Sequence, residues 1–485
     1  MHLPQTFGQL KASGYINKSV RDEIRSNLIS KLSTGQSLFD GIFGYDQTVI
    51  PDIERALLCG HNILFLGLRG QAKTRLARST AQLLDEYIPI VAGSEINDNP
   101  FKPISGYAKA LLDEQGDNTS IQWVHRDERY IEKLATPDVS VSDLIGDLDP
   151  IKAVNHKVGF DHEAAIHYGL IPRSNRSIFA INELPDLQAR IQVSLLNILE
   201  ENDLQIRGFK LKLPLDVFFI FTANPEDYTQ RGNIITPLKD RIESQILTHY
   251  PENVETSLLI SRHEARLSPH QKTEIVIPEL LEYIIEQIGF SARESEYIDD
   301  KSGVSARMSI AARELLHGAV ERRVLLNKEK NGTARLTDLL SIVPALTGKM
   351  ELVFEGEQLG PYDVALTLIN DAIQIQLNKR FPKVQDSRHK LNPDFQSICN
   401  WFNKGNELIL NSDDTQSLYQ KELKKVPVSK NLLKDYSDSD QAFHVECILH
   451  HIAATQSIQK DWLDNRIVFK DQLASMLNDL NIESN

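Results

Sequence analysis

The residues best placed to do chemistry form a glycine-containing stretch that ends in a lysine and a threonine. Glycines permit a tight backbone path that turns several N–H groups toward one phosphate. A lysine that follows can reach the outer phosphates of a nucleotide, and a threonine hydroxyl can ligate Mg²⁺. The stretch therefore predicts a phosphate-binding loop for ATP, whose binding residues are Gly67, Gly70, Gln71, Ala72, Lys73 and Thr74.

One position of this loop departs from the usual spacing, in which a glycine stands directly before the lysine. Here Ala72 takes that place. An alanine is tolerated if its backbone φ is negative, because residues with a Cβ rarely adopt positive φ. On that condition we interpret Ala72 as a modest departure. The alternative is a glycine-rich turn beside a chance Lys-Thr pair, and the further motifs argue against it.

A second candidate segment has four apolar residues followed by Asn182 and Glu183, the form of a Walker B segment. In that chemistry the first acid holds Mg²⁺ through water, and the second polarises the attacking water. Glu183 stands at the second position, and Asn182 stands where Asp is usual. An amide oxygen can accept a hydrogen bond from metal-bound water but carries no charge, so we expect weaker metal binding. Nucleotide binding is better supported than fast hydrolysis.

Three further polar residues complete a candidate catalytic set with Glu183. Asn224 follows an apolar run and can orient the attacking water against the terminal phosphate. Arg241 is the type of residue that a neighbouring subunit inserts to neutralise charge in the transition state. Arg307 stands at an expected helix start, from which it could reach the nucleotide. An isolated arginine is more often solvated or salt-bridged, and the order of these residues favours the functional interpretation.

The elements that must position these residues alternate between buried strands and helices. Apolar runs at 63–66, 178–181 and 217–221 predict parallel strands, each ending at a polar or glycine-containing turn. This alternation predicts an α/β fold with a parallel sheet and with ligands at the carboxyl ends of the strands.

The pattern divides the chain into four parts. Residues 1–37 form an N-terminal helical segment, and residues 38–250 form the nucleotide-binding core. Strand signals fade afterwards, so we expect a helical lid domain over 251–380. Residues 381–485 are expected to be a linker and a mostly helical region of unknown role, in which His444, His450 and His451 favour a surface or core role over a metal site.

Composition narrows the classes of protein. The 485 residues carry a formal net charge of −14, which disfavours a protein that coats nucleic acid. Three cysteines lack the spacing of a disulfide framework or a zinc site. The first residues lack the pattern of a signal peptide, and the sequence contains no apolar run long enough to span a bilayer. We expect a cytoplasmic protein without membrane contact.

As a set, the motifs resemble AAA+ ATPases of the group that contains the magnesium-chelatase motor subunit (subunit I) and MoxR. The resemblance covers about residues 38–380. It is carried by the phosphate loop and by residues 41–46, 62–67, 143–147, 182–183, 224–226 and 240–241.

The resemblance implies an AAA+ P-loop NTPase core that assembles as a ring, expected to be a hexamer. ATP and Mg²⁺ would lie at subunit interfaces, with Thr74 and Asn182 toward the metal and Arg241 acting in trans. Two hairpin insertions would occur, within 140–174 and over 203–213, the latter turning at Arg207-Gly208. Members of the group often work with a partner that bears a von Willebrand factor A domain.

The leading hypothesis is an ATP-driven motor that remodels or activates a protein client, with metal insertion as one form of that work. A true magnesium-chelatase motor is the second, and Asn182 and the unfamiliar C-terminal region count against it. The third is a nucleotide-dependent scaffold or switch with little hydrolysis, suggested by Asn182 and Ala72. The client, the ring size and the role of residues 381–485 are left open.

Overall fold

The computed structural model describes residues 3–159, 162–201, 203–206, 212–225, 232–299, 303–388, 390–434, 436–437, 440–463 and 465–471. The chain divides into two compact units, Met1–Tyr250 and Pro251–Asn485, and each is described by itself.

The first unit is built on a five-stranded parallel sheet with the strand order β11-β1-β10-β7-β4. Its strands are β1 (Ile63–Leu66), β4 (Tyr130–Leu134), β7 (Ser177–Asn182), β10 (Val217–Ala223) and β11 (Ser244–Leu247). Every residue of the three central strands is buried, because helices cover both faces of the sheet. The three predicted strands are therefore confirmed, and the order brings their carboxyl ends to one edge.

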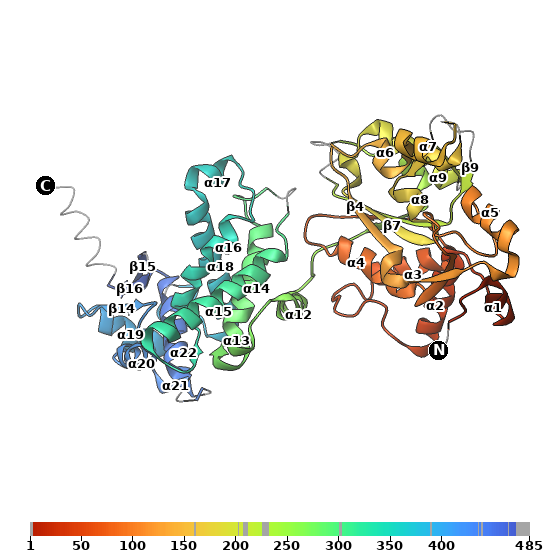
Figure 1. Cartoon of the computed structure of the whole chain (residues 1–485). Helices are drawn as coiled ribbons and strands as arrows, with labels where there is room; N and C mark the ends of the chain where they lie inside the picture. The colour runs from red at the N-terminus through yellow and green to blue at the C-terminus, as the bar shows by residue number, and fades with distance from the viewer. Residues whose placement is uncertain are drawn as a thin grey trace. The chain divides into compact units, whose positions relative to one another are not determined.

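The two faces of this sheet pack against different helices (Figure 1). One face, represented by Phe65 and Ala180, shares a hydrophobic cluster with α2 (Val20–Thr34), α3 (Val49–Cys59) and α4 (Lys73–Ser79). The other face packs against α6 (Val141–Leu144), α8 (Leu170–Arg173) and α9 (Ala189–Glu201). Because side chains alternate along a strand, a polar residue at the strand end belongs to one face only.

The N-terminal helix α2 is part of this core. Ser19 caps it by accepting a hydrogen bond from the Asp22 N–H, and Gly35 ends it in the left-handed conformation. Within the helix, Glu23 is buried and accepts two hydrogen bonds of 2.7 Å from the buried Arg129 guanidinium. This pair fixes α2 to the start of β4.

Both predicted hairpin insertions form. β5 (Gly146–Leu148) pairs antiparallel with β6 (Ile166–Tyr168), and the intervening α7 (Pro150–His156) exposes Ile151 and Val154. β8 (Asp203–Gln205) pairs antiparallel with β9 (Lys212–Pro214). The turn predicted at Arg207-Gly208 lies outside the described residues, as does Phe160 of the first insertion.

Smaller elements complete the first unit. A separate antiparallel pair joins β2 and β3, beside short helices. The elements are α1 (Phe7–Ala12), β2 (Tyr87–Val91), α5 (Gly106–Gln115), β3 (Ile121–His125) and α11 (Thr236–Arg241), and the 3-10 turns η1 (Thr80–Leu83), η2 (Gly116–Asn118), η3 (Arg126–Arg129), η4 (Glu163–Ala165) and η5 (Leu184–Asp186).

The second unit is mostly helical. Its long helices are α14 (Glu279–Arg293), α15 (Arg307–Asn327) and α18 (Pro361–Arg380). Around them lie α12 (Val254–Glu264), α13 (Pro269–Glu274), β12 (Ile275–Val276), β13 (Gly332–Thr333), η6 (Leu336–Ile342), α16 (Val343–Thr347), α17 (Phe354–Leu359), α19 (Pro393–Phe402), α20 (Gln416–Leu423), α21 (Lys430–Leu433) and α22 (Gln441–Ala453).

A three-stranded antiparallel sheet, which the sequence analysis did not predict, lies near the C-terminus of this unit. Its order is β14 (Leu408–Asn411), β16 (Arg466–Lys470) and β15 (Gln459–Leu463). One hydrophobic cluster extends from Ile275 to Phe469, so the expected lid and C-terminal region share a single core. The four-part division of the chain stays a prediction.

The predicted fold class is confirmed: an α/β core with a P-loop, a parallel sheet and hairpin insertions, followed by a mostly helical region. Among the residues that the structure describes, no helix combines the length and the apolar character that a membrane span requires.

Candidate functional site

The phosphate loop connects β1 to α4, the position that the sequence predicts. Gly67 leaves the strand with its Cα surrounded: a Cβ there would lie 2.0 Å from Thr248 Oγ1 and 2.2 Å from Gln71 Oε1. A Cβ here would displace both side chains, so the position favours glycine. Gly70 has a φ of +76°, which also favours glycine. Lys73 and Thr74 open α4, so backbone N–H groups at the helix start are available to an anion.

Tyr45 and the residues that follow β11 hold the loop. The Tyr45 hydroxyl lies between the carbonyl oxygens of His249 and Gln71, at 2.8 and 3.0 Å, and Thr248 Oγ1 donates to Gln71 Oε1 at 2.8 Å. The Tyr250 hydroxyl donates to the Arg69 carbonyl oxygen at 2.9 Å. Burial raises the pKa of Tyr45, so it stays a neutral donor. These contacts fix the loop before any ligand arrives.

Lys73 folds back on its own loop. Its Nζ donates to the carbonyl oxygens of Gly67 and Leu68, the latter at 2.9 Å. To reach an outer phosphate the amine must exchange these carbonyl partners for phosphate oxygens, which keeps it hydrogen-bonded throughout.

Ala72 corrects one expectation from the sequence. The interpretation as a modest departure requires a negative φ, but the φ of Ala72 is +56° and its ψ is 14°, the left-handed region. The loop must reverse there so that α4 can begin at Lys73. A Cβ in that conformation costs about 1–2 kcal/mol, so Ala72 introduces strain that glycine would avoid.

Glu183 also has a left-handed backbone, with a φ of +56°. It follows β7 directly, and its side chain is exposed at the carboxyl edge of the sheet. The Glu183 N–H donates to Thr222 Oγ1 at 3.1 Å, which ties the residue to the end of β10. Strained non-glycine residues of this kind cluster at functional sites, where the surrounding contacts maintain the strain.

Asn182 lies in a line of hydrogen bonds that crosses three strands. Thr222 Oγ1 on β10 donates to Asn182 Oδ1 at 3.1 Å, and Asn182 Nδ2 donates to Glu132 Oε1 on β4 at 2.6 Å. Glu132 is also paired with Arg78 on α4, whose Nε lies 2.7 Å from Glu132 Oε2. The sequence analysis missed Thr222, Glu132 and Arg78. Glu132, in the strand-like run 130–134, could have been noticed as a charged residue in a strand. The residues that lie beside it, however, depend on the strand order, which local sequence patterns do not show.

Asn224 follows β10 at the same edge. The residue is 6% exposed, and its Oδ1 has no hydrogen-bond partner among the residues that the structure describes. A buried acceptor without a donor is costly, so it indicates a missing donor such as a water or a ligand hydroxyl. This orphan acceptor and the oxygen-rich donor set fit a nucleotide with Mg²⁺, which prefers oxygen ligands and keeps several waters.

The structure thus brings the phosphate loop, Asn182, Glu183 and Asn224 to one edge of the sheet. Arg241 belongs to the same unit but is engaged elsewhere: it ends α11, its Nε donates to Glu200 Oε2 at 2.8 Å, and its side chain is 30% exposed. Arg307 lies in the second unit, where it begins α15 and is exposed. The catalytic, nucleotide-binding and metal roles of all these residues stay predictions.

Other candidate ligands in the chain are structural. His444, His450 and His451 are buried in α22, so of the surface and core roles that the sequence left open they take the core role. Cys399 and Cys447 are buried and Cys59 is exposed, all as free thiols. Across the described residues, no three His, Cys, Asp or Glu side chains come together in a group that could hold a metal.

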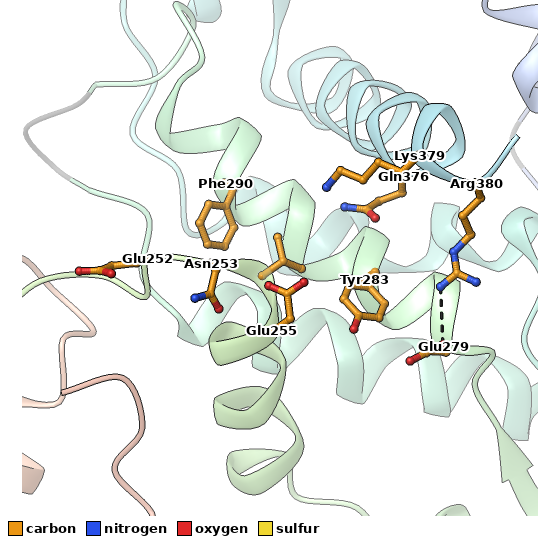
Figure 2. A pocket seen from close by; sticks show the side chains of 10 residues that line it. Glu252, Asn253, Glu255, Glu279, Tyr283, Phe290, Gln376, Lys379 and Arg380 are labelled. Carbon is orange, nitrogen blue, oxygen red and sulfur yellow. Dashed lines mark ion pairs between the residues drawn. The ribbon is translucent and has the colours of Figure 1, made fainter. Parts of the chain in front are cut away.

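The second unit has a surface hollow of about 430 Å³ where the start of α12 meets α14 and α18 (Figure 2). Its wall mixes charges of both signs, including an ion pair between Arg380 and Glu279 with an Nη2–Oε2 distance of 3.6 Å. The lining residues are Glu252, Asn253, Val254, Glu255, Glu279, Tyr283, Phe290, Gln376, Lys379 and Arg380. None of the predicted site residues lines it.

In comparisons with known proteins, no model of a protein family matches the sequence. The search of curated proteins also finds no match.

Solved structures do resemble the chain, at low identity. NtrX from Brucella abortus is 14% identical with a TM-score of 0.35, and the similarity covers 60% of this chain and 55% of NtrX. The chain therefore spans about half the length of that protein. A protein of Cytophaga hutchinsonii described as an ATPase is 18% identical with a TM-score of 0.30, covering 74% of this chain and 97% of that one.

A structure of the complex between subunits BchI and BchD of magnesium chelatase contains a chain that is 20% identical to this one, with a TM-score of 0.35. The similarity covers 66% of this chain and 98% of the other. With TM-scores below 0.5, these similarities do not decide the family, the substrate or the partner of this chain.

Proposed function

We propose that the chain is an AAA+ motor of the magnesium-chelatase and MoxR type, which binds ATP with Mg²⁺ and hydrolyses it to remodel or activate a protein client. The observation that carries the proposal is the convergence of three segments at one sheet edge. The loop after β1, Asn182 and Glu183 at the end of β7, and Asn224 after β10 all lie at the carboxyl ends of parallel strands, where α/β sheets bind ligands.

In this proposal each group has one task. The loop N–H groups and Lys73 bind the phosphates, and the Thr74 hydroxyl holds Mg²⁺. Glu183 polarises the attacking water, and the Asn224 side chain orients it; the Asn224 Oδ1 is buried and has no partner within the described part of the chain. Mg²⁺ would neutralise phosphate charge when bound.

The proposal also includes the assembly of several copies of the chain. The chain forms a ring, a hexamer by its resemblance, in which Arg241 reaches the nucleotide of a neighbouring subunit. For that, Arg241 must leave its ion pair with Glu200, and side chains so exposed exchange partners at little cost. Arg307 contributes from the helical unit. A cytoplasmic location, metal insertion into the client and a partner with a von Willebrand factor A domain belong to the same proposal.

A second candidate is a nucleotide-dependent switch with little hydrolysis. The observation that favours it is the uncharged Asn182 at the metal position, together with the strained Ala72 in the phosphate loop. A true magnesium-chelatase motor is the narrower alternative within the first candidate.

The test is steady-state ATP hydrolysis with Mg²⁺ by the full chain, beside Lys73→Ala and Glu183→Gln. We expect turnover that both substitutions abolish, while the Glu183→Gln variant still binds ATP. Glu114→Gln, an exposed glutamate on α5, is the matched control and should leave turnover unchanged. ATP binding with no turnover above that of Glu183→Gln would favour the switch over the motor.

The role of Arg241 in trans has its own test. Lys73→Ala and Arg241→Ala should each be inactive alone. A mixture forms some interfaces with an intact loop from one subunit and an intact Arg241 from the next, so it should recover part of the turnover. A mixture as inactive as its components would contradict the trans role.

A further inference from the structure

The proposed ATP site lacks one negative charge, and the inference drawn here rests on that proposed function. At the strand end where an acid usually holds the metal through water, Asn182 offers only a neutral amide. Its amide oxygen is also already engaged, because it accepts a hydrogen bond from Thr222 Oγ1 at 3.1 Å. Asn182 alone is therefore a poor replacement for an aspartate.

A carboxylate that could supply the missing negative charge lies on the strand beside β7. Glu132 lies on the edge strand β4, opposite Ala180 of β7 in the parallel register, so its side chain is on the same face as Ala180 and Asn182. That face is covered by α4, the helix that begins with Lys73 and Thr74. Glu132 reaches forward along the strand to place Oε1 2.6 Å from Asn182 Nδ2.

The hydrogen bonds fix the orientation of the Asn182 amide. Thr222 Oγ1 accepts from the Glu183 N–H, so its own proton goes to Asn182 Oδ1. The amide nitrogen must then face Glu132, whose ionised carboxylate can only accept. Asn182 is thus a connector between the end of β10 and a carboxylate on β4.

We propose that Glu132 supplies the carboxylate that holds the Mg²⁺ of the bound nucleotide through a metal-bound water, in place of the acid missing at position 182. Its side chain is 22% exposed, which leaves it open to an incoming ion and its waters. A second feature of the same edge points to a ligand: Asn224 Oδ1 is buried and has no hydrogen-bond partner among the described residues.

The proposal also accounts for an asparagine at position 182. An aspartate there would put a carboxylate oxygen where Nδ2 now lies, 2.6 Å from Glu132 Oε1. Two carboxylates at that distance cannot both stay ionised. With the charge on β4, the neutral amide is the residue type that satisfies both neighbours.

Arg78 supplies the counter-charge to Glu132. It lies on the phosphate-loop helix, donates from Nη2 to Glu132 Oε1 at 3.0 Å and from Nε to Oε2 at 2.7 Å, and its side chain is 64% exposed. An exposed arginine can turn into solvent at little cost when a divalent cation arrives. Arg78 and Mg²⁺ therefore compete for the same carboxylate.

The test measures binding, so it does not depend on turnover. A non-hydrolysable ATP analogue is titrated into the full chain by calorimetry, with Mg²⁺ and with EDTA, and the ratio of the two affinities gives the gain from the metal. We expect Glu132→Gln to reduce that gain about tenfold, while affinity in EDTA stays near the wild-type value. Gln keeps the shape of the side chain and an oxygen for Asn182 Nδ2.

Two controls separate the effect of the negative charge of Glu132 from its structural role as the partner of Arg78. If Glu132 acted only as the partner of Arg78, Arg78→Ala would reproduce the loss; we expect it to preserve or increase the metal gain. The double variant Asn182→Asp, Glu132→Gln moves the carboxylate back to β7, and it should restore most of the gain that Glu132→Gln loses. Melting temperatures without ligand check that each variant folds.

The outcomes test the role of Glu132 separately from the proposed ATP site. If the wild type binds the analogue in a Lys73-dependent way but Glu132→Gln keeps the full metal gain, the role of Glu132 is wrong and the ATP site stands. If Arg78→Ala causes the same loss as Glu132→Gln, the role of Glu132 is also wrong. If the wild type binds no analogue, both proposals fail together.

Discussion

Two carboxylates, one in each unit, show how differently the same group can be used. Glu132 at the edge of the parallel sheet is partly exposed and shares its oxygens between an exposed arginine and an amide. Glu446 on α22 is fully buried and accepts hydrogen bonds from Leu336 N, Thr337 N, Thr337 Oγ1 and the Tyr419 hydroxyl, at 2.5–3.1 Å.

The residues around Glu446 and those around Glu132 differ as well. The Glu446 carboxylate itself is saturated by these four donors, the Arg335 guanidinium lies 4.2 Å from the Tyr419 ring centroid, and burial raises the pKa of Glu446 and of Tyr419. At the sheet edge the backbone is strained at Ala72 and Glu183, and Asn224 Oδ1 has no hydrogen-bond partner among the residues described. The comparison teaches that a buried carboxylate saturated by donors stabilises its unit, whereas a carboxylate shared with an exposed arginine can exchange partners.

The largest expected effect is on stability. Glu446→Ala leaves four donors without their acceptor, each worth about 1–3 kcal/mol, so we expect a loss of several kcal/mol in the second unit. Glu132→Ala removes a partly exposed ion pair and leaves one donor, Asn182 Nδ2, without its acceptor, so it should cost less, about 1–3 kcal/mol. Urea unfolding followed by tryptophan fluorescence measures both. In a Trp123→Phe background, Trp401 and Trp462 report the second unit alone. Equal losses for the two variants would break the comparison.

Acid should destabilise the second unit through its buried histidines. Burial lowers the pKa of His444 from 6.5 to about 4, and it also lowers the pKa of His450 and His451. The unfolded chain therefore binds protons that the folded unit does not, so stability is full above pH 6.5 and falls as the pH drops toward about 4.

The matched variant for this pH effect is His444→Phe, which keeps an aromatic ring beside Tyr436 and Phe443. It should flatten part of the decline in the free energy of unfolding between pH 6.5 and 4. A variant with an unchanged slope would show that His444 does not contribute.

A smaller effect is expected at Gly67. Gly67→Ala places a Cβ against Thr248 Oγ1 and Gln71 Oε1, so the hydrogen bond between those two side chains must break or move. Overpacking of this kind costs about 1–3 kcal/mol and should also weaken ATP binding. Gly318→Ala, in an open position of α15, is the control and should be neutral or stabilising. Normal ATP affinity in Gly67→Ala would show that the loop geometry is not needed.

The smallest expected effect tests the strain at Ala72. Ala72→Gly relieves a left-handed alanine but adds flexibility to the unfolded chain, so we expect a net gain of about 0.5 kcal/mol in stability. Ala77→Gly, in the helical and buried part of α4, should instead destabilise by about 1 kcal/mol or more. A thermal unfolding scan compares the two, and destabilisation by both would remove the argument for strain.

Much of the first unit could be predicted from the sequence because its signals are local. The runs at 63–66, 178–181 and 217–221 are continuous and apolar, which is how strands buried on both faces appear. The polar residues directly after those runs then had to meet at one edge. This rule alone was enough to predict that the loop motif, Asn182, Glu183 and Asn224 lie together.

What the sequence could not provide depends on tertiary context. The contact of Asn182 with Glu132 requires the strand order, in which β4 lies beside β7 although about forty-five residues separate them. The positive φ of Ala72 depends on how β1 meets α4. The sheet of β14, β15 and β16 was missed because its strands are short and Lys460 and Asp461 interrupt the apolar pattern of β15.

The central claim is that the carboxyl edge of the parallel sheet binds ATP. The most direct measurement is calorimetric titration of ATP into the full chain and into Lys73→Ala, both with Mg²⁺, after melting temperatures show that both are folded. We predict saturable binding by the wild type and at least about a hundredfold weaker binding by the variant, since a charge-assisted contact to the phosphates is lost. Equal affinity in the two proteins, or no binding by the wild type, would contradict the claim.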